Sequence, residues 1–260
     1  MKYASDTPVN NPLDRTANDL FKRLSVLGFG LFAYVAGCVG LFWFILGLGG
    51  LAPVSLSEWQ AATPTGAVLT NLGLILLFGV QHTVMARPWF KDKLVKIIPQ
   101  AAERASFMLM SGIVTVFAIY FWQPLPGTVW QIDNSIAQIA LWSLYALAWA
   151  YLLLATFVTN HFELMGLRQV YLYFRQIPYR PLPFTRKFMY RYSRHPMMLG
   201  FLIGMWSIPV MSVTHFCMAT LFSLYIAVGI FFEERDLIKN FGDTYRRYKQ
   251  DIATFIPRLF

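Results

Sequence analysis

The chain has 260 residues, of which 57% are hydrophobic and only 13% are charged. Soluble domains carry about 25% charged residues, so this composition excludes an ordinary soluble domain and indicates an integral membrane protein. The formal net charge of +9 would suit nucleic acid, but the basic residues gather beside apolar runs, where they report membrane orientation, and we expect no nucleic-acid partner.

The predicted elements are helices long enough to cross a membrane. Residues 1–20 are polar and predict a cytoplasmic tail without a cleavable signal peptide. A double-length apolar run at 196–232 contains no Asp, Glu, Lys or Arg. At about 20 residues per span, the pattern predicts an all-α, polytopic transmembrane helical bundle in a single domain 1–260, with four spans plus a C-terminal hydrophobic hairpin, five to six membrane helices in total. The four spans are predicted at 24–49, 66–86, 106–122 and 136–159.

The distribution of Lys and Arg predicts the topology. Four precede the first span, five lie in 87–104, seven in 168–194 and six from 235 onward, which accounts for all 22. The positive-inside rule therefore places both termini and the connection 163–195 in the cytoplasm, as in a bacterial inner-membrane protein. The prolines of this connection predict a short amphipathic helix and a loop on the membrane surface, which could also act as a lid.

Several polar residues fall at the cytoplasmic ends of the predicted spans. Taken singly, each is more often a helix-packing or interfacial residue than a catalytic one. Polar groups at one depth of a membrane usually line a cavity, so the cluster predicts a pocket. Its candidate catalytic residues are His82, Glu103, Asn160, His161 and Glu163. His161 is our first choice as general base because an imidazole titrates near neutral pH, with Asn160 as neighbour and Glu163 or Glu103 orienting a histidine.

A second cluster flanks the uncharged hairpin. Pro196 suits the first position of a helix, whose free N–H groups then favour a carboxylate. Gly200 permits close approach to the backbone, and Glu233 with Glu234 offers negative charge for a hydroxyl or a cation. An apolar stripe at helical spacing follows, which suits either core packing or stacking of an adenine. The stripe consists of Leu237, Phe241, Tyr245 and Tyr248.

These residues form a pattern that resembles the C-terminal signature of the isoprenylcysteine carboxyl methyltransferase superfamily. The pattern is Tyr190-x-Tyr192-x-Arg194-His195-Pro196-x-x-x-Gly200, followed by Glu233-Glu234 and the aromatic stripe. Met198 stands where the carboxyl methyltransferases commonly have Tyr. With Gln81 to Pro88 and Asn160 to Leu167, the chain is more similar to the methanethiol S-methyltransferase branch and to accessory proteins of nitric-oxide respiration.

The resemblance implies an S-adenosylmethionine-dependent methyltransferase with a small volatile thiol as substrate. Its signature residues, Tyr190, Tyr192, Arg194, His195, Pro196, Gly200, Glu233, Glu234 and Tyr245, are the expected cofactor-binding set, within a hairpin and tail at 190–260. Two alternatives stay open: a lipidic acceptor, such as a prenylcysteine carboxylate or a lipid amine, and a non-catalytic accessory protein. We expect no metal site, since no paired histidines occur on one helix. The oligomeric state is not predicted.

Overall fold

The computed structural model describes residues 17–256. Within that range, five helices are long and apolar enough to cross a membrane, as the sequence predicts. They are α1 (Ala17–Leu48), α2 (Pro64–Met85), α4 (Glu103–Phe121), α5 (Ser135–Val158) and α9 (Val213–Phe241). The polytopic all-helical fold class is thereby confirmed, while residues 1–16 of the predicted polar tail lie outside the described residues.

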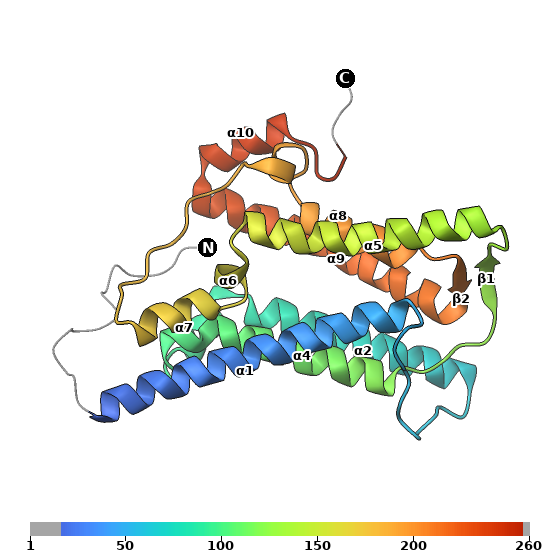
Figure 1. Cartoon of the computed structure of the whole chain (residues 1–260), viewed down its shortest axis with the longest axis horizontal. Coiled ribbons are helices and arrows are strands. Elements are labelled where there is room, and N and C mark those ends of the chain that lie inside the picture. Colours follow the sequence, from blue (N-terminus) through green and yellow to red (C-terminus); the bar gives the residue numbers. More distant parts are fainter. Residues whose placement is uncertain (1–16, 257–260) are drawn as a thin grey trace.

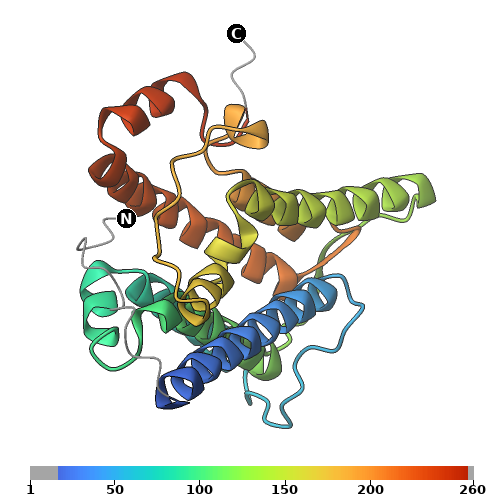
Figure 2. The same ribbon diagram turned by 60° about the vertical axis from the view of Figure 1, so that its left-hand side comes forward.

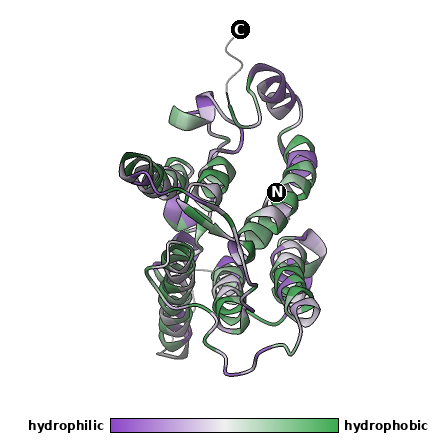
Figure 3. Cartoon of the chain, turned by 90° about the vertical axis from the view of Figure 1, so that its right-hand side faces the viewer, coloured by the Kyte–Doolittle hydropathy of each residue, from purple (hydrophilic) through white to green (hydrophobic). Residues whose placement is uncertain are grey.

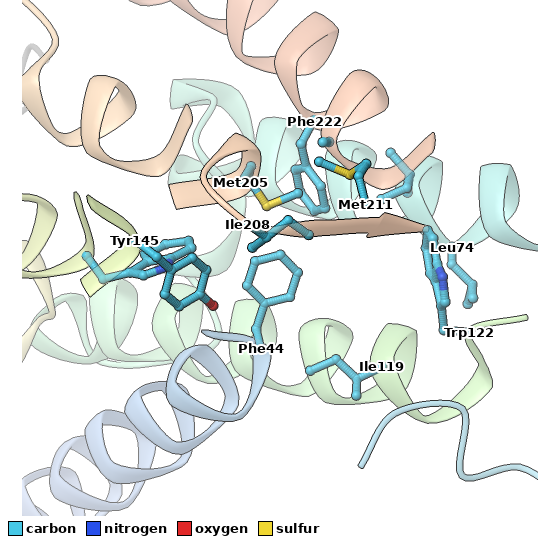
Figure 4. Packing of buried hydrophobic residues seen from close by; sticks show 12 residues of the cluster. Phe44, Leu74, Ile119, Trp122, Tyr145, Met205, Ile208, Met211 and Phe222 are labelled. Carbon is cyan, nitrogen blue, oxygen red and sulfur yellow. The ribbon is translucent and has the colours of Figure 1, made fainter. Parts of the chain in front are cut away.

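The long helices form two groups that meet at one end (Figures 1 and 2). In the first group, α1 and α2 both pack against α4, and in the second, α8 (Pro196–Trp206) packs against α5 and α9. Contacts between α2 and α9 join the groups. The shared core contains Phe44, Tyr145, Met205, Met211 and Phe222, which converge from both groups in Figure 4. Outside this core the long helices carry hydrophobic residues, whereas α10 (Asp243–Asp251), at the top of Figure 3, is mostly hydrophilic.

The C-terminal hairpin has unequal arms. Its first arm, α8, has 11 residues, which is about 16 Å of helix and roughly half of a hydrocarbon core. Pro209 then prevents the helix from continuing, and the chain extends into β2 (Val210–Ser212). This strand pairs antiparallel with β1 (Thr128–Gln131) from the loop between α4 and α5, an element the sequence did not predict. The hairpin therefore reaches the end of the bundle where α4 leads into α5.

The second arm of the hairpin continues far beyond the apolar run. Helix α9 passes through Glu233 and Glu234 without a break and ends at Phe241. Gly242 then takes a positive φ of 54°, which turns the chain into α10. The predicted stripe is therefore split between two helices, and its expected single helical face is wrong.

Short elements complete the end of the bundle that holds the predicted sites. The connection 163–195 forms a short helix and a proline-rich segment at 175–187, as predicted. Gly166, at φ 87°, turns the chain so closely against α4 that an added Cβ would lie 2.5 Å from the Ala105 nitrogen, so a side chain there is excluded. The short elements are α3 (Pro88–Leu94), η1 (Gln100–Ala102), α6 (His161–Leu164), α7 (Leu167–Phe174) and η2 (Phe188–Arg191).

Candidate active site

Arg194 fastens the start of α8 to the C-terminal segment of the chain. Its Nε donates to Glu234 Oε1 at 2.7 Å and its Nη2 to Thr254 Oγ1 at 2.8 Å, while Nη1 donates to the carbonyls of Lys249 and Ile252. The backbone N–H of Arg194 also donates to the Ala253 carbonyl at 3.0 Å. Most of the donors of this guanidinium are therefore used within the protein.

The two neighbouring carboxylates of α9 differ in what they bind. Glu234 is buried, with His195 Nε2 at 3.2 Å from its Oε1 and Lys249 Nζ at 2.6 Å from its Oε2, in addition to Arg194. The Glu233 side chain is 45% exposed, and among the described residues its one ion-pair partner is His195, whose Nδ1 lies at 3.5 Å. Glu233 thus keeps free acceptor positions for a ligand, whereas Glu234 is committed to internal ion pairs.

An aromatic cluster lies beside these carboxylates. Phe184 packs against Phe241, Tyr245 and Tyr248 with ring centroids 5.1 to 5.8 Å apart. The Tyr248 hydroxyl donates to the Tyr190 carbonyl at 2.7 Å. Burial raises the pKa of Tyr248 to about 12, and burial followed by the charge of Glu234 raises the pKa of Tyr245. The Tyr245 hydroxyl is buried and has no hydrogen-bond partner among the described residues. It is therefore a donor left for a ligand.

The other four residues of the signature differ in their surroundings. Tyr190 is buried, and burial and then the charge of Glu233 raise its pKa. Tyr192 is 60% exposed. Pro196 starts α8, and no side chain caps that helix. The Leu199 N–H donates to the His195 carbonyl at 3.0 Å, so the N–H groups left for a ligand in the first turn are those of Met197 and Met198. Gly200 packs on α5, since an added Cβ would lie 2.8 Å from the Ala148 carbonyl oxygen. This helix contact accounts for the glycine without a cofactor.

His161 is held by hydroxyls from two long helices. Its Nε2 lies 2.9 Å from the Tyr34 hydroxyl of α1, and its Nδ1 lies 2.8 Å from Thr156 Oγ1 of α5. The ring stacks on Phe157 at a centroid distance of 4.5 Å and is 4% exposed. Burial lowers the pKa of His161. A neutral imidazole at this junction of the two helix groups is suited to accept a proton.

Asn160 and Glu163 have structural partners. Asn160, at φ 78°, accepts the Glu163 N–H at 3.0 Å and so caps α6. The Glu163 carboxylate accepts from Arg168 at 2.7 Å and from Tyr179 at 2.6 Å. These contacts turn Glu163 towards the 175–187 segment, so the expectation that Glu163 orients His161 is wrong.

His82 and Glu103 lie in other contacts. His82 packs between Phe78 and Phe107, and its Nδ1 is 3.3 Å from Ser111 Oγ. Glu103 pairs with Lys91 at 3.1 Å. Burial lowers the pKa of Lys91, and Glu103 opposes that shift. In the described part of the chain, neither residue hydrogen-bonds or ion-pairs with His161, so Glu103 does not orient a histidine as predicted.

A hollow of about 440 Å³ opens beside His161. Its walls come from the end of α5, from α6 and from the 175–187 segment, which all lie at the α10 end of the molecule (Figure 1). Thr159 in this wall also lies near the phenol of Tyr190, so the hollow adjoins the cluster around α8. The lining residues are Phe157, Val158, Thr159, Asn160, His161, Phe162, Leu182, Pro183 and Thr185.

Sequence reasoning missed Tyr34, Thr156 and Tyr179. The first two lie inside apolar runs and the third in a proline-rich segment, where hydroxyl residues are common. Their separations from His161 or Glu163 range from 5 to 127 positions. The packing of α1 against α7 reveals Tyr34, and the turns of the chain after α5 reveal the other two.

The fold and the site define a polytopic membrane protein with a polar site at one end of its helices. Residues 142–244 match a family model described as phospholipid methyltransferase. The chain is 36% identical over 242 residues to a methanethiol S-methyltransferase of Crocosphaera subtropica, covering 93% of this chain and 95% of that protein. It is 37% identical over 237 residues to one of Mycobacterium tuberculosis, covering 91% and 97%.

The chain therefore belongs to the family of membrane methyltransferases that contains these methanethiol S-methyltransferases. The resemblance seen in the signature residues is confirmed. A more distant relative, Nurim of Bos taurus, is 23% identical over 199 residues, 72% of this chain and 75% of that protein. No solved structure matches the chain.

Proposed function

We propose that this protein transfers the methyl group of S-adenosylmethionine to methanethiol and releases dimethyl sulfide and S-adenosylhomocysteine. The observation that carries the proposal is its identity of 36% and 37% to proteins named methanethiol S-methyltransferase over 93% and 91% of the chain. The reaction is an in-line displacement, in which a thiol sulfur attacks a methyl group held about 3 to 3.5 Å away.

The cluster around α8 fits the methyl donor. The uncapped N-terminus of α8 suits the carboxylate of S-adenosylmethionine, because helix N-termini carry partial positive charge and free N–H groups. Glu233 has acceptor positions for the amino group or a ribose hydroxyl. The buried, unpartnered hydroxyl of Tyr245 offers a further hydrogen bond. The ion pair between Arg194 and Glu234 holds the elements of this site together.

The hollow beside His161 fits the acceptor. Phe157, Phe162, Leu182 and Pro183 give it apolar walls, which suit a methyl thiol. A thiol is mostly protonated at neutral pH and reacts as the thiolate. His161, kept neutral by burial, is the base that takes the proton. Asn160 lines the end of the hollow, Glu163 binds Tyr179 of the 175–187 segment beside it, and His82 packs elsewhere.

The charge pattern supports a position in a bacterial inner membrane with both termini in the cytoplasm. The α8 cluster and the hollow then face the cytoplasm, from which the charged cofactor arrives. In this single membrane domain, segment 163–195 covers the site. Segment 190–260 contains the residues that bind the cofactor. A volatile, lipid-soluble thiol and its sulfide product can pass through the bilayer.

The test is methyl transfer by the purified, detergent-solubilised protein. The protein is incubated with S-adenosylmethionine and methanethiol, and dimethyl sulfide is measured in the headspace. Parallel reactions contain a prenylcysteine or a phospholipid amine as acceptor. We expect dimethyl sulfide from methanethiol and no product from the lipidic acceptors. Methylation of a lipidic acceptor alone would replace the substrate, and calorimetry without any cofactor binding would favour an accessory protein.

A further inference from the structure

The hydrogen bonds around His161 determine which ring nitrogen carries the proton. Thr156 has one hydroxyl hydrogen, and it donates this hydrogen to the Leu153 carbonyl at 2.6 Å. Its Oγ1 therefore accepts in the 2.8 Å contact with His161 Nδ1. Nδ1 must then bear the hydrogen, since a neutral imidazole has one N–H.

The opposite nitrogen, Nε2, consequently has a free lone pair. Its partner is the Tyr34 hydroxyl at 2.9 Å, which must be the donor. The phenol oxygen still has lone pairs to accept a hydrogen bond from another group. The basic atom of His161 is thus covered by Tyr34, and a proton can reach it only through that hydroxyl or after Tyr34 moves.

We propose that Tyr34 is a catalytic residue, which relays the proton of the acceptor thiol to His161 Nε2, and that Thr156 is the positioning residue that fixes the required tautomer. This inference rests on the proposed function, because it assigns the path of the proton in that reaction. It also brings α1, which lies outside residues 142–244 matched by the methyltransferase family model, into the active site.

The sulfur of methanethiol forms a bond to the methyl carbon as the bond from that carbon to the sulfonium sulfur breaks. The thiol proton passes to the Tyr34 oxygen while the Tyr34 proton passes to Nε2. His161 becomes an imidazolium that still donates from Nδ1 to Thr156, and the positive charge of the sulfonium has moved to the ring. Release of that proton to water restores the neutral ring.

The surroundings of the ring suit this path. Phe157 stacks on one face, and Phe162 and Tyr34 contact it edge-on. The nearest carboxylate along the sequence, Glu163, is turned to Arg168 and Tyr179, so the described residues bring no negative partner to the imidazolium. The Cys38 thiol, one turn beyond Tyr34 on α1, lies within hydrogen-bonding reach of the phenol.

The decisive variants are Tyr34→Phe and Thr156→Val, each of which removes one hydroxyl. General acid–base groups contribute about 100- to 10,000-fold to rates, so we expect Tyr34→Phe to lower kcat at least about 100-fold with the affinity for S-adenosylmethionine unchanged. The control for Tyr34→Phe is Tyr120→Phe, because Tyr120 is 41% exposed on α4. The control for Thr156→Val is Thr70→Val, because the Thr70 hydroxyl donates to the Gly66 carbonyl of its own helix. Both controls should retain wild-type turnover.

The two variants should shift the titration of His161 in opposite directions. Loss of the Tyr34 donor removes a bond that stabilises neutral Nε2, so the pKa of His161 rises. Loss of the Thr156 hydroxyl removes the acceptor of the hydrogen bond from Nδ1–H. That bond is stronger in the imidazolium than in the neutral ring, so the pKa of His161 falls. Each shift should be about one unit. Nitrogen-15 NMR of histidine-labelled protein, with His161 assigned by its loss in His161→Gln, reads the tautomer and both titrations independently of turnover.

Three results would overturn the inference. One is an Nε2-protonated His161 in the wild-type protein. Another is wild-type kcat in Tyr34→Phe while methanethiol is methylated normally, which leaves the proposed function standing. The third is the same direction of pKa shift in both variants, as a general loosening of the fold would give. A wild-type protein that forms no dimethyl sulfide removes the proposed function and this inference together.

Discussion

The side chains of Arg194 and Glu234 meet at 2.7 Å across 40 positions of the sequence, and both are more than nine-tenths buried. This contact joins the Arg-His-Pro segment to the C-terminal part of α9. Lys249 of α10 forms an ion pair with the same carboxylate. The two charged ends of the apolar hairpin are therefore joined directly. The neighbouring Glu233 stays partly open, and the difference between the two carboxylates leads to the first prediction.

Glu234→Ala should destabilise the protein, whereas Glu233→Ala should weaken cofactor binding. Removing one partner of a buried ion pair costs about 3 to 5 kcal/mol, since the remaining charge is left without compensation. Thermal unfolding in detergent, followed by tryptophan fluorescence, measures the first effect. Calorimetry with S-adenosylmethionine measures the second. Equal losses of stability in the two variants would contradict this division of roles.

Gly200→Ala should reduce stability by about 1 to 3 kcal/mol, because overpacking forces adjustment of the backbone. The added Cβ would lie 2.8 Å from the Ala148 carbonyl and 3.0 Å from Leu152. Gly229→Ala on α9 is the matched control, since nothing lies within 4 Å of its added Cβ. Thermal unfolding of both variants compares them, and a similar effect at the two positions would show that α5 and α8 do not pack this closely.

Tyr179→Phe should loosen the 175–187 segment over the hollow. The variant removes the 2.6 Å bond from the Tyr179 hydroxyl to Glu163 and leaves the Arg168 bonds to the Arg180 carbonyl in place. Trypsin should then cleave faster after the exposed Arg186 and Lys187. Mass spectrometry of timed digests measures the rates. Tyr171→Phe, exposed on α7, is the control, and equal rates in the two variants would exclude a tether at Tyr179.

Acidification should remove the part of the stability that comes from neutral His161. Burial lowers the pKa of His161 in the folded protein below the value of about 6.5 in an unfolded chain. The unfolded state then binds more protons as the pH falls, so stability falls below about pH 6.5. The melting temperature of the wild-type protein should decline towards pH 5 more steeply than that of His161→Gln. Parallel declines would show that another group controls acid stability.

The sequence predicted the membrane helices, and the proximity of the two charged ends of the apolar run, because both depend on short-range patterns. Apolar runs of about 20 residues need no tertiary contact to be recognised, and Arg194, Glu233 and Glu234 border one such run. Prediction failed where the chain direction changes. Gly242 splits the aromatic stripe, and the extended segment after Pro209 shortens α8 and pairs with β1.

The roles of the candidate catalytic residues required the tertiary structure. His161 could be named from its type and depth, but Glu163 and Glu103 were assigned to it on depth alone, and each has a cationic partner elsewhere. The sequence by itself determined that the chain crosses a membrane and where its charged groups gather, because solvation of apolar and charged groups acts on each segment separately. Only the tertiary structure decided that Tyr34 of α1 and Thr156 of α5 hold His161. The packing of distant helices brings the Tyr34 hydroxyl to the ring, and the turn between α5 and α6 brings the ring back to Thr156.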